Sequence, residues 1–274
     1  TSEPAPDPVI ALWKDGLARR LDLSALPPSA TAELLDTISG TVFTAGDNVY
    51  SDGTTKEFAD CYAPSWGRHK NRTYPVVGNH EYLTPGAAGY FSYFGAKAGD
   101  PAKGWYSYDV GAWHLVALNS NCSKVGGCRA GSPQERWLRS DLAAHPNRCT
   151  LAYWHHPRWS SGQHGSFESM GAVVRALYEA GAELALAGHD HSYERFAPQD
   201  PSGRADADRG IRQFVVGTGG KNLYPVGDLL PNSEAHSDDT YGVLRLTLHA
   251  SSYDWQFVPA AGGTFTDSGT ATCH

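Results

Sequence analysis

Five short polar clusters carry the residues that could bind metal ions or move protons. They are Asp15, 46–50 (Gly-Asp-Asn-Val-Tyr), 78–81 (Gly-Asn-His-Glu), 155–157 (His-His-Pro) and 188–191 (Gly-His-Asp-His). Taken singly, each has a plainer explanation, since Gly-Asp is common in turns and Asn-His at helix starts. His189 and His191 stand two residues apart, so they share one face of an extended chain and could grip one ion or two neighbouring ions. Mixed oxygen and nitrogen donors in five successive clusters favour a site for Fe, Mn or Zn.

Each cluster lies at or near the end of a short apolar run, and three of the runs end directly in Gly-Asp, Gly-Asn-His or Gly-His. The runs are Val9–Trp13, Thr41–Ala45, Tyr74–Val77, Thr150–His155 and Glu183–Ala187. Their length and the loops around them predict buried strands. In open α/β sheets the carboxyl ends of the strands meet at one edge, and we therefore expect the five clusters to converge there.

Other segments predict the helices and hairpins around these strands. Ser132 precedes Pro and, three positions on, Glu135, which predicts a helix from 133 to about His145. We expect Ser166 to cap a second helix with an apolar face. Alternating residues in 105–118 and 241–258 predict antiparallel hairpins. The pattern indicates an α/β protein with an extended segment at 1–8 and a single domain over 9–274.

Composition excludes several classes of protein. The 274 residues are 41% hydrophobic and 19% charged, which is typical of a folded chain. The net charge of −7 argues against a general nucleic-acid binder. No apolar run approaches the ~18 residues that span a bilayer. The 12 histidines outnumber the 7 lysines, and this favours metal or proton chemistry.

The five cysteines predict disulfide bonds rather than a zinc ribbon, because none forms a CxxC pair. Cys122 and Cys128 flank a short loop and could close a local disulfide. Cys149 could pair with Cys273, or Cys61 with either of these two. Disulfides, together with an N-terminus that looks processed, predict a secreted or periplasmic protein.

The motifs resemble those of the calcineurin-like metallophosphoesterases, and most closely their purple acid phosphatase branch. The matching residues are Gly46-Asp47-x-x-Tyr50, Gly78-Asn79-His80-Glu81, His155-x-Pro157 and Gly188-His189-x-His191-x-Tyr193-Glu194-Arg195. They follow the family's order along the chain. The resemblance implies a four-layer α/β/β/α sandwich with mixed sheets.

The resemblance also implies a ligand set for two metal ions. Asp15, Tyr50 and His191 would hold the first ion, Asn79, His155 and His189 the second, and Asp47 would bridge both. Leu17 stands where most relatives carry a histidine ligand, and Tyr50 supplies the donor that is otherwise missing. A tyrosine phenolate favours Fe(III) at the first position, while the second would take Fe(II), Zn(II) or Mn(II).

The activity implied is hydrolysis of phosphomonoesters through in-line attack by a metal-bound hydroxide. His80 would protonate the leaving group, and Asp47, Asn79 and His164 would complete the catalytic set. Glu81 could orient His80 or act only as a first-turn carboxylate of a helix. The partners are a small phosphate ester and inorganic phosphate, without nucleic acid or membrane, in a monomer or homodimer.

Two alternatives remain at this stage. The same metal core could serve a phosphodiesterase or nucleotidase. The protein could also be a catalytically impaired homologue that binds metal or phosphate, because Lys14 precedes Asp15 where relatives carry glycine, and Asp22 is the fallback ligand.

Overall fold

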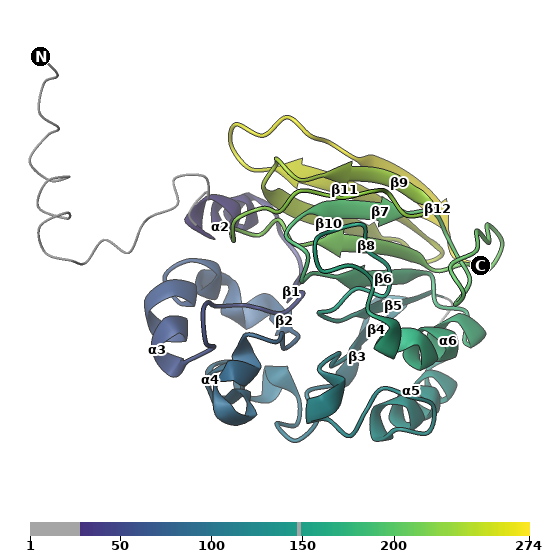
Figure 1. Cartoon of the computed structure of the whole chain (residues 1–274), viewed down its shortest axis with the longest axis horizontal. Coiled ribbons are helices and arrows are strands. Elements are labelled where there is room, and N and C mark those ends of the chain that lie inside the picture. Colours follow the sequence, from purple (N-terminus) through teal and green to yellow (C-terminus); the bar gives the residue numbers. More distant parts are fainter. Residues whose placement is uncertain (1–27, 147–148) are drawn as a thin grey trace, which may run out of the picture.

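A computed structural model of the chain describes residues 28–146 and 149–274. Figure 1 shows two β-sheet layers with helices packed along one side and a smaller helical lobe beside the first strands. The expected segment 1–8, the expected strand 9–13 and the residues Lys14, Asp15 and Asp22 lie outside the described residues.

The larger sheet has seven strands in the order β3-β4-β5-β6-β8-β7-β9. Their bounds are β3 Tyr106–Val110, β4 Trp113–Ala117, β5 Cys149–Tyr153, β6 Leu184–Ala187, β7 Tyr193–Phe196, β8 Arg212–Val216 and β9 Ser233–Ser237. The central strands β4, β5, β6 and β8 run parallel, whereas β3, β7 and β9 pair antiparallel. The expected strands at 150–155 and 183–187 and the hairpin at 105–118 are confirmed.

Two smaller sheets complete the β structure. One is the parallel pair of β1 (Val42–Thr44) and β2 (Thr73–Pro75), which confirms two further expected strands. The other contains β10 (Gly242–Leu248), β11 (Ser252–Pro259) and β12 (Ser268–Thr272), all antiparallel. The β10–β11 pair is the predicted second hairpin.

The helices are short and lie between the strands. The α-helices are α2 Pro28–Thr37, α3 Thr55–Glu57, α4 Ala88–Phe94, α5 Pro133–Ala144 and α6 Gly171–Glu179. One π-helix is η1 Phe58–Tyr62. The 3-10 helices are η2 Trp66–Arg72, η3 Glu81–Leu83, η4 Pro85–Ala87, η5 Gly95–Ala98, η6 Cys122–Lys124 and η7 Glu168–Met170. Among the described residues, none of the helices has both the length and the apolar character to span a membrane.

One helix start is predicted correctly and the other is wrong. The Ser132 side chain accepts a hydrogen bond from the Glu135 amide and caps α5, as its sequence indicates. Ser166 does not cap α6, which begins at Gly171 after the turn η7. Its hydroxyl instead accepts from the Ser160 amide, at 3.2 Å, so it serves the loop before the helix.

Two hydrophobic core layers lie on either side of the seven-stranded sheet, and a third cluster, with Phe58 and Tyr90, fills the helical lobe. Helices α5 and α6 cover one face, where Leu138 and Leu177 pack with Val116. On the other face Leu115 packs with Trp255 of the three-stranded sheet. Neighbouring β4 residues thus point into different layers, as expected for a strand buried on both faces. The arrangement confirms the predicted α/β class with mixed sheets.

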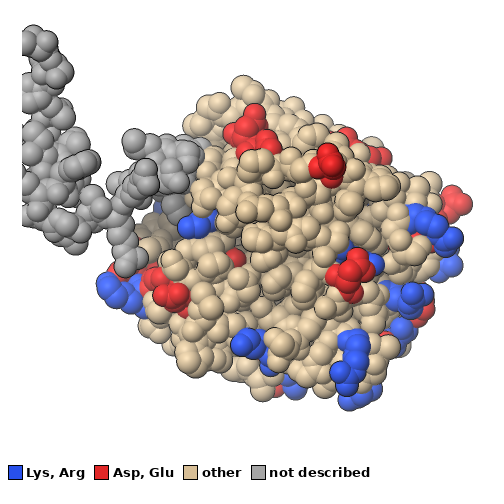
Figure 2. Space-filling model, in the orientation of Figure 1, with Lys and Arg blue, Asp and Glu red and all other residues tan. Residues whose placement is uncertain are grey.

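Charged side chains are scattered over the face drawn in Figure 2. On this face most Lys and Arg side chains lie along the right and lower right edge, some beside acidic ones, and the centre is mostly uncharged. The described residues visible there therefore form no continuous basic stripe of the kind that nucleic-acid binders use.

Two disulfides are present. Cys122–Cys128 closes the short loop that the sequence indicates. Cys149–Cys273, one of the pairings left open above, joins β5 of the large sheet to the segment after β12. Cys61 is free and exposed.

The long-range disulfide should contribute more to stability than the local one. Cys149 and Cys273 are separated by 124 residues, and Cys122 and Cys128 by 6. From loop-closure entropy we expect the Cys149→Ala/Cys273→Ala variant to lose about 5 kcal/mol of unfolding free energy and the Cys122→Ala/Cys128→Ala variant about 2 kcal/mol. Urea unfolding monitored by tryptophan fluorescence measures both. Equal losses would contradict the entropic explanation.

Candidate metal centre

The predicted site residues come from four loops that follow parallel strands. Asp47 and Tyr50 follow β1, Asn79 and His80 follow β2, His155 follows β5, and His189 and His191 follow β6. Sheet geometry brings these carboxyl ends together, and the side chains meet as the sequence predicts. Asp15 lies outside the described residues.

One group of donors surrounds the ring of His155, which is almost fully buried. Its Nε2 atom lies 2.9 Å from Asn79 Oδ1 and 3.1 Å from His189 Nδ1. The same Nε2 lies 3.3 Å from Asp47 Oδ2. The four side chains that the resemblance assigns to the second ion therefore surround one point.

A second group surrounds the hydroxyl of Tyr50. This hydroxyl lies 3.2 Å from Asp47 Oδ2 and 3.1 Å from His191 Nε2. Asp47 Oδ2 thus belongs to both groups. The geometry is that of two adjacent donor sets which share one carboxylate oxygen.

The orientation of the histidine rings fits metal binding. The Nδ1 atoms of His155 and His191 each lie 2.7 Å from a backbone carbonyl oxygen, that of Ala45 and that of Asn222 respectively. Such a bond fixes a proton on Nδ1 and turns Nε2 towards the centre, the arrangement common in metal-bound histidines. Imidazole, carboxylate, amide and phenol donors together suit Fe, Mn or Zn. The described residues therefore fit a binuclear centre.

Burial and neighbouring charges set the protonation states in the centre. Burial, reinforced by the nearby His155, lowers the pKa of His189 to about 2 and that of His156 to about 3, so both rings are neutral. Burial alone would raise the pKa of Asp47, but His155 outweighs it and holds that pKa well below its usual value. In return Asp47 raises the pKa of His155 against the effect of burial. The shared carboxylate is therefore ionised and attracts positive charge.

The pKa of Tyr50 shifts in the opposite direction to that of Asp47. Burial, followed by the charge of Asp47, raises the pKa of its hydroxyl well above the usual value. A phenolate at this position therefore requires a strongly acidic cation beside it.

The backbone of two ligand residues is strained. Asp47 has φ 48° and His189 has φ 66°, a left-handed conformation that non-glycine residues rarely adopt. Each such residue costs about 1–3 kcal/mol and persists only where its surroundings hold it, which is typical of functional sites.

Glu81 holds the strained loop at Asp47. Its buried carboxylate accepts hydrogen bonds from the amides of Gly78 at 2.6 Å, Asp47 at 3.1 Å and Asn48 at 2.5 Å. It thereby ties the loop after β1 to the loop after β2. Gly78 permits this approach, because a Cβ there would collide with Asp47. The Asn48 side-chain amide also donates to Glu81 Oε1, at 3.4 Å. The described bonds of Glu81 thus lead to backbone amides and to Asn48 rather than to the His80 ring.

His80 lies at the rim of the centre with 32% of its side chain exposed. Its Nδ1 lies 2.5 Å from the carbonyl oxygen of Ser51, and its Nε2 lies 4.0 Å from Asp47 Oδ2. The ring is thus anchored through one nitrogen, while the other faces Asp47 Oδ2, the oxygen that both donor groups share.

Two further histidines border the second donor group. The His164 amide donates to Asp190 Oδ1 at 2.7 Å, and its ring centre lies 4.4 Å from that of His189. His156 Nδ1 lies 2.8 Å from the Ser120 hydroxyl. The donor atoms of His155, His156 and His189 lie within 4.8 Å of one another. His156 therefore lies beside the donor group in space as well as in sequence.

Sequence reasoning missed the loop after β8. Tyr224 stacks on His191 with ring centres 4.2 Å apart, and Lys221 Nζ lies 4.8 Å from the ring centre of Tyr50. Asn222 supplies the carbonyl that orients His191. The sole sequence signal was the glycine-rich stretch 217–220 immediately before this loop.

Comparison with known families agrees with this geometry. Residues 28–193 match the family model described as calcineurin-like phosphoesterase. A solved structure of the purple acid phosphatase PPD1 from yellow lupin (Lupinus luteus) seeds shares the fold. It has a TM-score of 0.70 and 21% identity over 90% of this chain and 48% of that one.

Curated plant proteins are similar in sequence. A "Probable inactive purple acid phosphatase 1" of Arabidopsis thaliana is 25% identical over 93% of this chain and 47% of its own length. A "Nucleotide pyrophosphatase/phosphodiesterase" of Hordeum vulgare is 26% identical over 84% of this chain and 71% of its own. The chain spans about half the length of the first of these relatives. Because the family model matches more than half of the residues of this chain, the chain belongs to the calcineurin-like phosphoesterase family, in which several of its relatives are named purple acid phosphatases.

Proposed function

We propose that the protein is a binuclear-metal phosphatase which hydrolyses small phosphomonoesters to inorganic phosphate. The observation that carries this proposal is the pair of donor groups sharing Asp47 Oδ2, with the His80 ring at their rim. A one-ion site needs no second donor group of this kind. The test is metal analysis of the purified protein together with hydrolysis of an aryl phosphate.

The residues divide by role. Two ions held here would polarise a phosphoryl oxygen and lower the pKa of a bound water. Asn79, His155 and His189 would hold one ion, and Tyr50 and His191 would hold the other with Asp15. Asp47 would contribute to both donor groups. His80 Nε2 carries the proton for the leaving oxygen, while Ser51 retains the ring through Nδ1. His164 contacts the phosphate from the side of His189.

The donor types indicate the metals. A phenolate from Tyr50 is a hard anionic ligand and favours Fe(III) at its position. The other group has two neutral imidazoles, an amide and the shared carboxylate, and this set suits Fe(II), Zn(II) or Mn(II).

Two other functions are motivated by the relatives. The barley protein's name favours a phosphodiesterase or nucleotidase on the same core. Three Arabidopsis relatives are named probable inactive purple acid phosphatases, which favours a binding protein without turnover. Comparing turnover of an aryl phosphate with that of a bis-aryl phosphate separates the two enzymes. Full metal occupancy without hydrolysis of either substrate would favour the inactive homologue.

The proposal also covers the localisation, domain organisation and oligomeric state of the enzyme. Two disulfides support an exported protein, secreted or periplasmic. We propose that 9–274 acts as one catalytic domain, as a monomer or homodimer, on a small soluble ester without nucleic-acid or membrane partners.

Replacing His80 tests the leaving-group role. His80→Ala should leave the metal content unchanged, since the ring is at the rim. We expect kcat to fall by about 100-fold or more with an alkyl phosphate, but by less than about 10-fold with a nitro-substituted aryl phosphate, whose leaving group needs no acid. Steady-state kinetics on both substrates measure this difference. An equal loss on the two would refute the acid role.

Replacing Tyr50 tests the metal assignment. An iron–phenolate pair absorbs visible light, so the wild-type protein should show a broad visible band that Tyr50→Phe removes. Absorption spectra recorded alongside metal analysis provide the measurement. A colourless wild type with two zinc or manganese ions would overturn the Fe(III) assignment and leave the hydrolase proposal intact.

Replacing Glu81 tests positioning without touching a ligand. Glu81→Gln should lower the unfolding free energy by about 1–3 kcal/mol, because the new amide group faces backbone donors. Metal affinity should fall about 10–100-fold, as for other residues that hold ligands in place. Glu57→Gln is the matched control, since Glu57 caps α3 at the surface and glutamine can replace it there. Unchanged metal binding in Glu81→Gln would contradict the positioning role.

A further inference from the structure

Two buried carboxyl groups that follow β6 hold the loop between β5 and α6. Asp190 stands between His189 and His191, and Glu194 lies in β7. Their exposed fractions are 0% and 1%. A buried carboxylate is costly unless hydrogen bonds satisfy it. The bonds that satisfy these two come mainly from residues 160–164 of the loop.

Asp190 binds both ends of the segment 160–164. Its Oδ1 accepts from the His164 amide at 2.7 Å, and its Oδ2 accepts from the Ser160 hydroxyl at 2.5 Å. The Ser160 hydroxyl in turn accepts from the Gly162 amide at 3.0 Å. A Cβ at position 162 would lie 2.5 Å from Asp190 Cγ, so only glycine lets the backbone pass this close. The loop therefore closes around this one carboxyl group.

Glu194 fixes the middle of the same segment. Its carboxylate accepts from the Ser161 amide at 2.8 Å and from the Ser161 hydroxyl at 2.6 Å. The Ser161 carbonyl oxygen accepts from the Gly227 amide at 2.9 Å, in the loop after β8 that also carries Tyr224. The segment is thus attached to β7 and to the loop after β8, and Asp190 connects it to the loop of the two ligand histidines.

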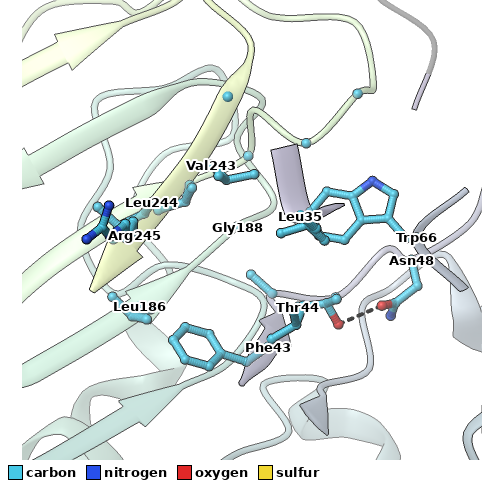
Figure 3. Close-up of a pocket in the computed structure, with 18 of the residues that line it drawn as sticks. Leu35, Phe43, Thr44, Asn48, Trp66, Leu186, Gly188, Val243, Leu244 and Arg245 are labelled. Atoms are coloured by element: carbon cyan, nitrogen blue, oxygen red, sulfur yellow. Dashed lines mark hydrogen bonds between the residues drawn. The ribbon is translucent and has the colours of Figure 1, made fainter. Parts of the chain in front are cut away.

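The loop that carries Asp190 has little freedom of its own. It begins at Gly188, which lines a pocket together with Thr44 of β1 (Figure 3). A Cβ at Gly188 would lie 3.0 Å from the Ala45 carbonyl oxygen, so the loops after β1 and β6 are in close contact. The Asp190 amide donates to the Gly188 carbonyl at 2.8 Å, and the Asp190 carbonyl accepts from the Ser192 amide at 2.9 Å. Asp190 is therefore a fixed point to which a neighbouring loop can be tied.

The His164 ring depends on this backbone attachment for its place. The residue is exposed, and within the described ranges no hydrogen bond holds the ring itself. Its ring centre lies 4.4 Å from that of His189 and 5.6 Å from that of Tyr224. Since the amide is held and the ring is not, the position of the backbone decides where the ring stands.

We propose that Asp190 is a positioning residue: by holding the His164 amide, it places the His164 ring beside His189, where the ring contacts a bound phosphate. The inference rests on the proposed function only in that a phosphate group binds there. The role needs hydrogen-bond acceptors rather than a charge, because the bonded partners are an amide and a hydroxyl. Asparagine retains this capacity, since its oxygen can accept from the His164 amide while its NH2 donates to the Ser160 hydroxyl.

Binding of inorganic phosphate to the metal-loaded protein, measured by isothermal titration calorimetry, tests the proposal. Asp190→Ala should raise the phosphate dissociation constant about 10-fold and leave the metal content unchanged. Asp190→Asn should restore most of the affinity. Gly162→Ala should also weaken binding, because its Cβ displaces the loop while both ligand histidines stay intact. Gly171→Ala is the matched control, since the nearest atom to a Cβ there is 3.9 Å away.

A double-mutant cycle shows whether Asp190 acts through His164. His164→Ala should raise the dissociation constant about as much as Asp190→Ala does. The double variant should lose no more than either single variant, because the ring that Asp190 positions is then absent. Should Asp190→Ala fail to fold, Gly162→Ala takes its place in the cycle.

Three results would overturn the proposal: independent losses that multiply in the double variant, loss of metal in Asp190→Ala, or equal weakening by Asp190→Asn and Asp190→Ala. Coupled phosphate binding in a protein without turnover would refute the proposed phosphatase and not the role of Asp190. An active phosphatase with independent losses would refute the role of Asp190 alone. A metal-loaded wild type that binds no phosphate would refute both.

Discussion

The carboxylate of Glu81 holds together the two loops on which the centre depends. It accepts three backbone hydrogen bonds, two from the loop after β1 and one from the loop after β2. Burial, followed by the charge of Asp47, raises the pKa of Glu81 to about 7, so its carboxyl is only partly ionised near neutral pH. Even at about 0.5–1.5 kcal/mol each, as for an ordinary hydrogen bond, three such bonds together are enough to offset the strain of about 1–3 kcal/mol in a left-handed residue such as Asp47. Asp47 is thereby fixed with one oxygen between the His155 and Tyr50 groups. Removing this single acceptor would release the residue that both donor groups share.

The fold supplies the remaining orientation through its backbone. His155 and His191 are both aligned by backbone carbonyls, from Ala45 and Asn222, rather than by other side chains. Those carbonyls belong to loops at strand ends, so the sheets themselves set the directions of the rings. The core packing that fixes β4, β5 and β6 therefore also fixes the orientation of these histidine rings. A shift of one strand against its neighbour would turn a histidine nitrogen away from the centre.

The sequence was informative where the determinants are local. Apolar runs predicted β1, β2, β5 and β6, and Ser132 with Glu135 predicted α5. The start of α6 was wrong because the Ser166 hydroxyl is engaged by Ser160, a contact set by loop packing. The motif residues do meet, but the bonds that Glu81 accepts from the amides of Asp47 and Asn48 span more than 30 positions, and no local pattern encodes them. Likewise the pairing of Cys149 with Cys273 and the arrival of Lys221 at Tyr50 arise from long-range packing.

Membership of the phosphoesterase family is stronger evidence for the fold than for catalytic activity. The two donor groups differ in charge. The His155 group includes the neutral imidazole of His189 and depends on Asp47 for negative charge, whereas the Tyr50 group can add a phenolate only when a strongly acidic cation lowers the pKa of the Tyr50 hydroxyl. Because Asp47 is shared, an ion in one group reduces the negative charge available to the other. Binding of the second ion therefore depends on how many anionic donors the Tyr50 group contains. A family member with an intact fold and one missing carboxylate would keep the architecture and lose the paired centre.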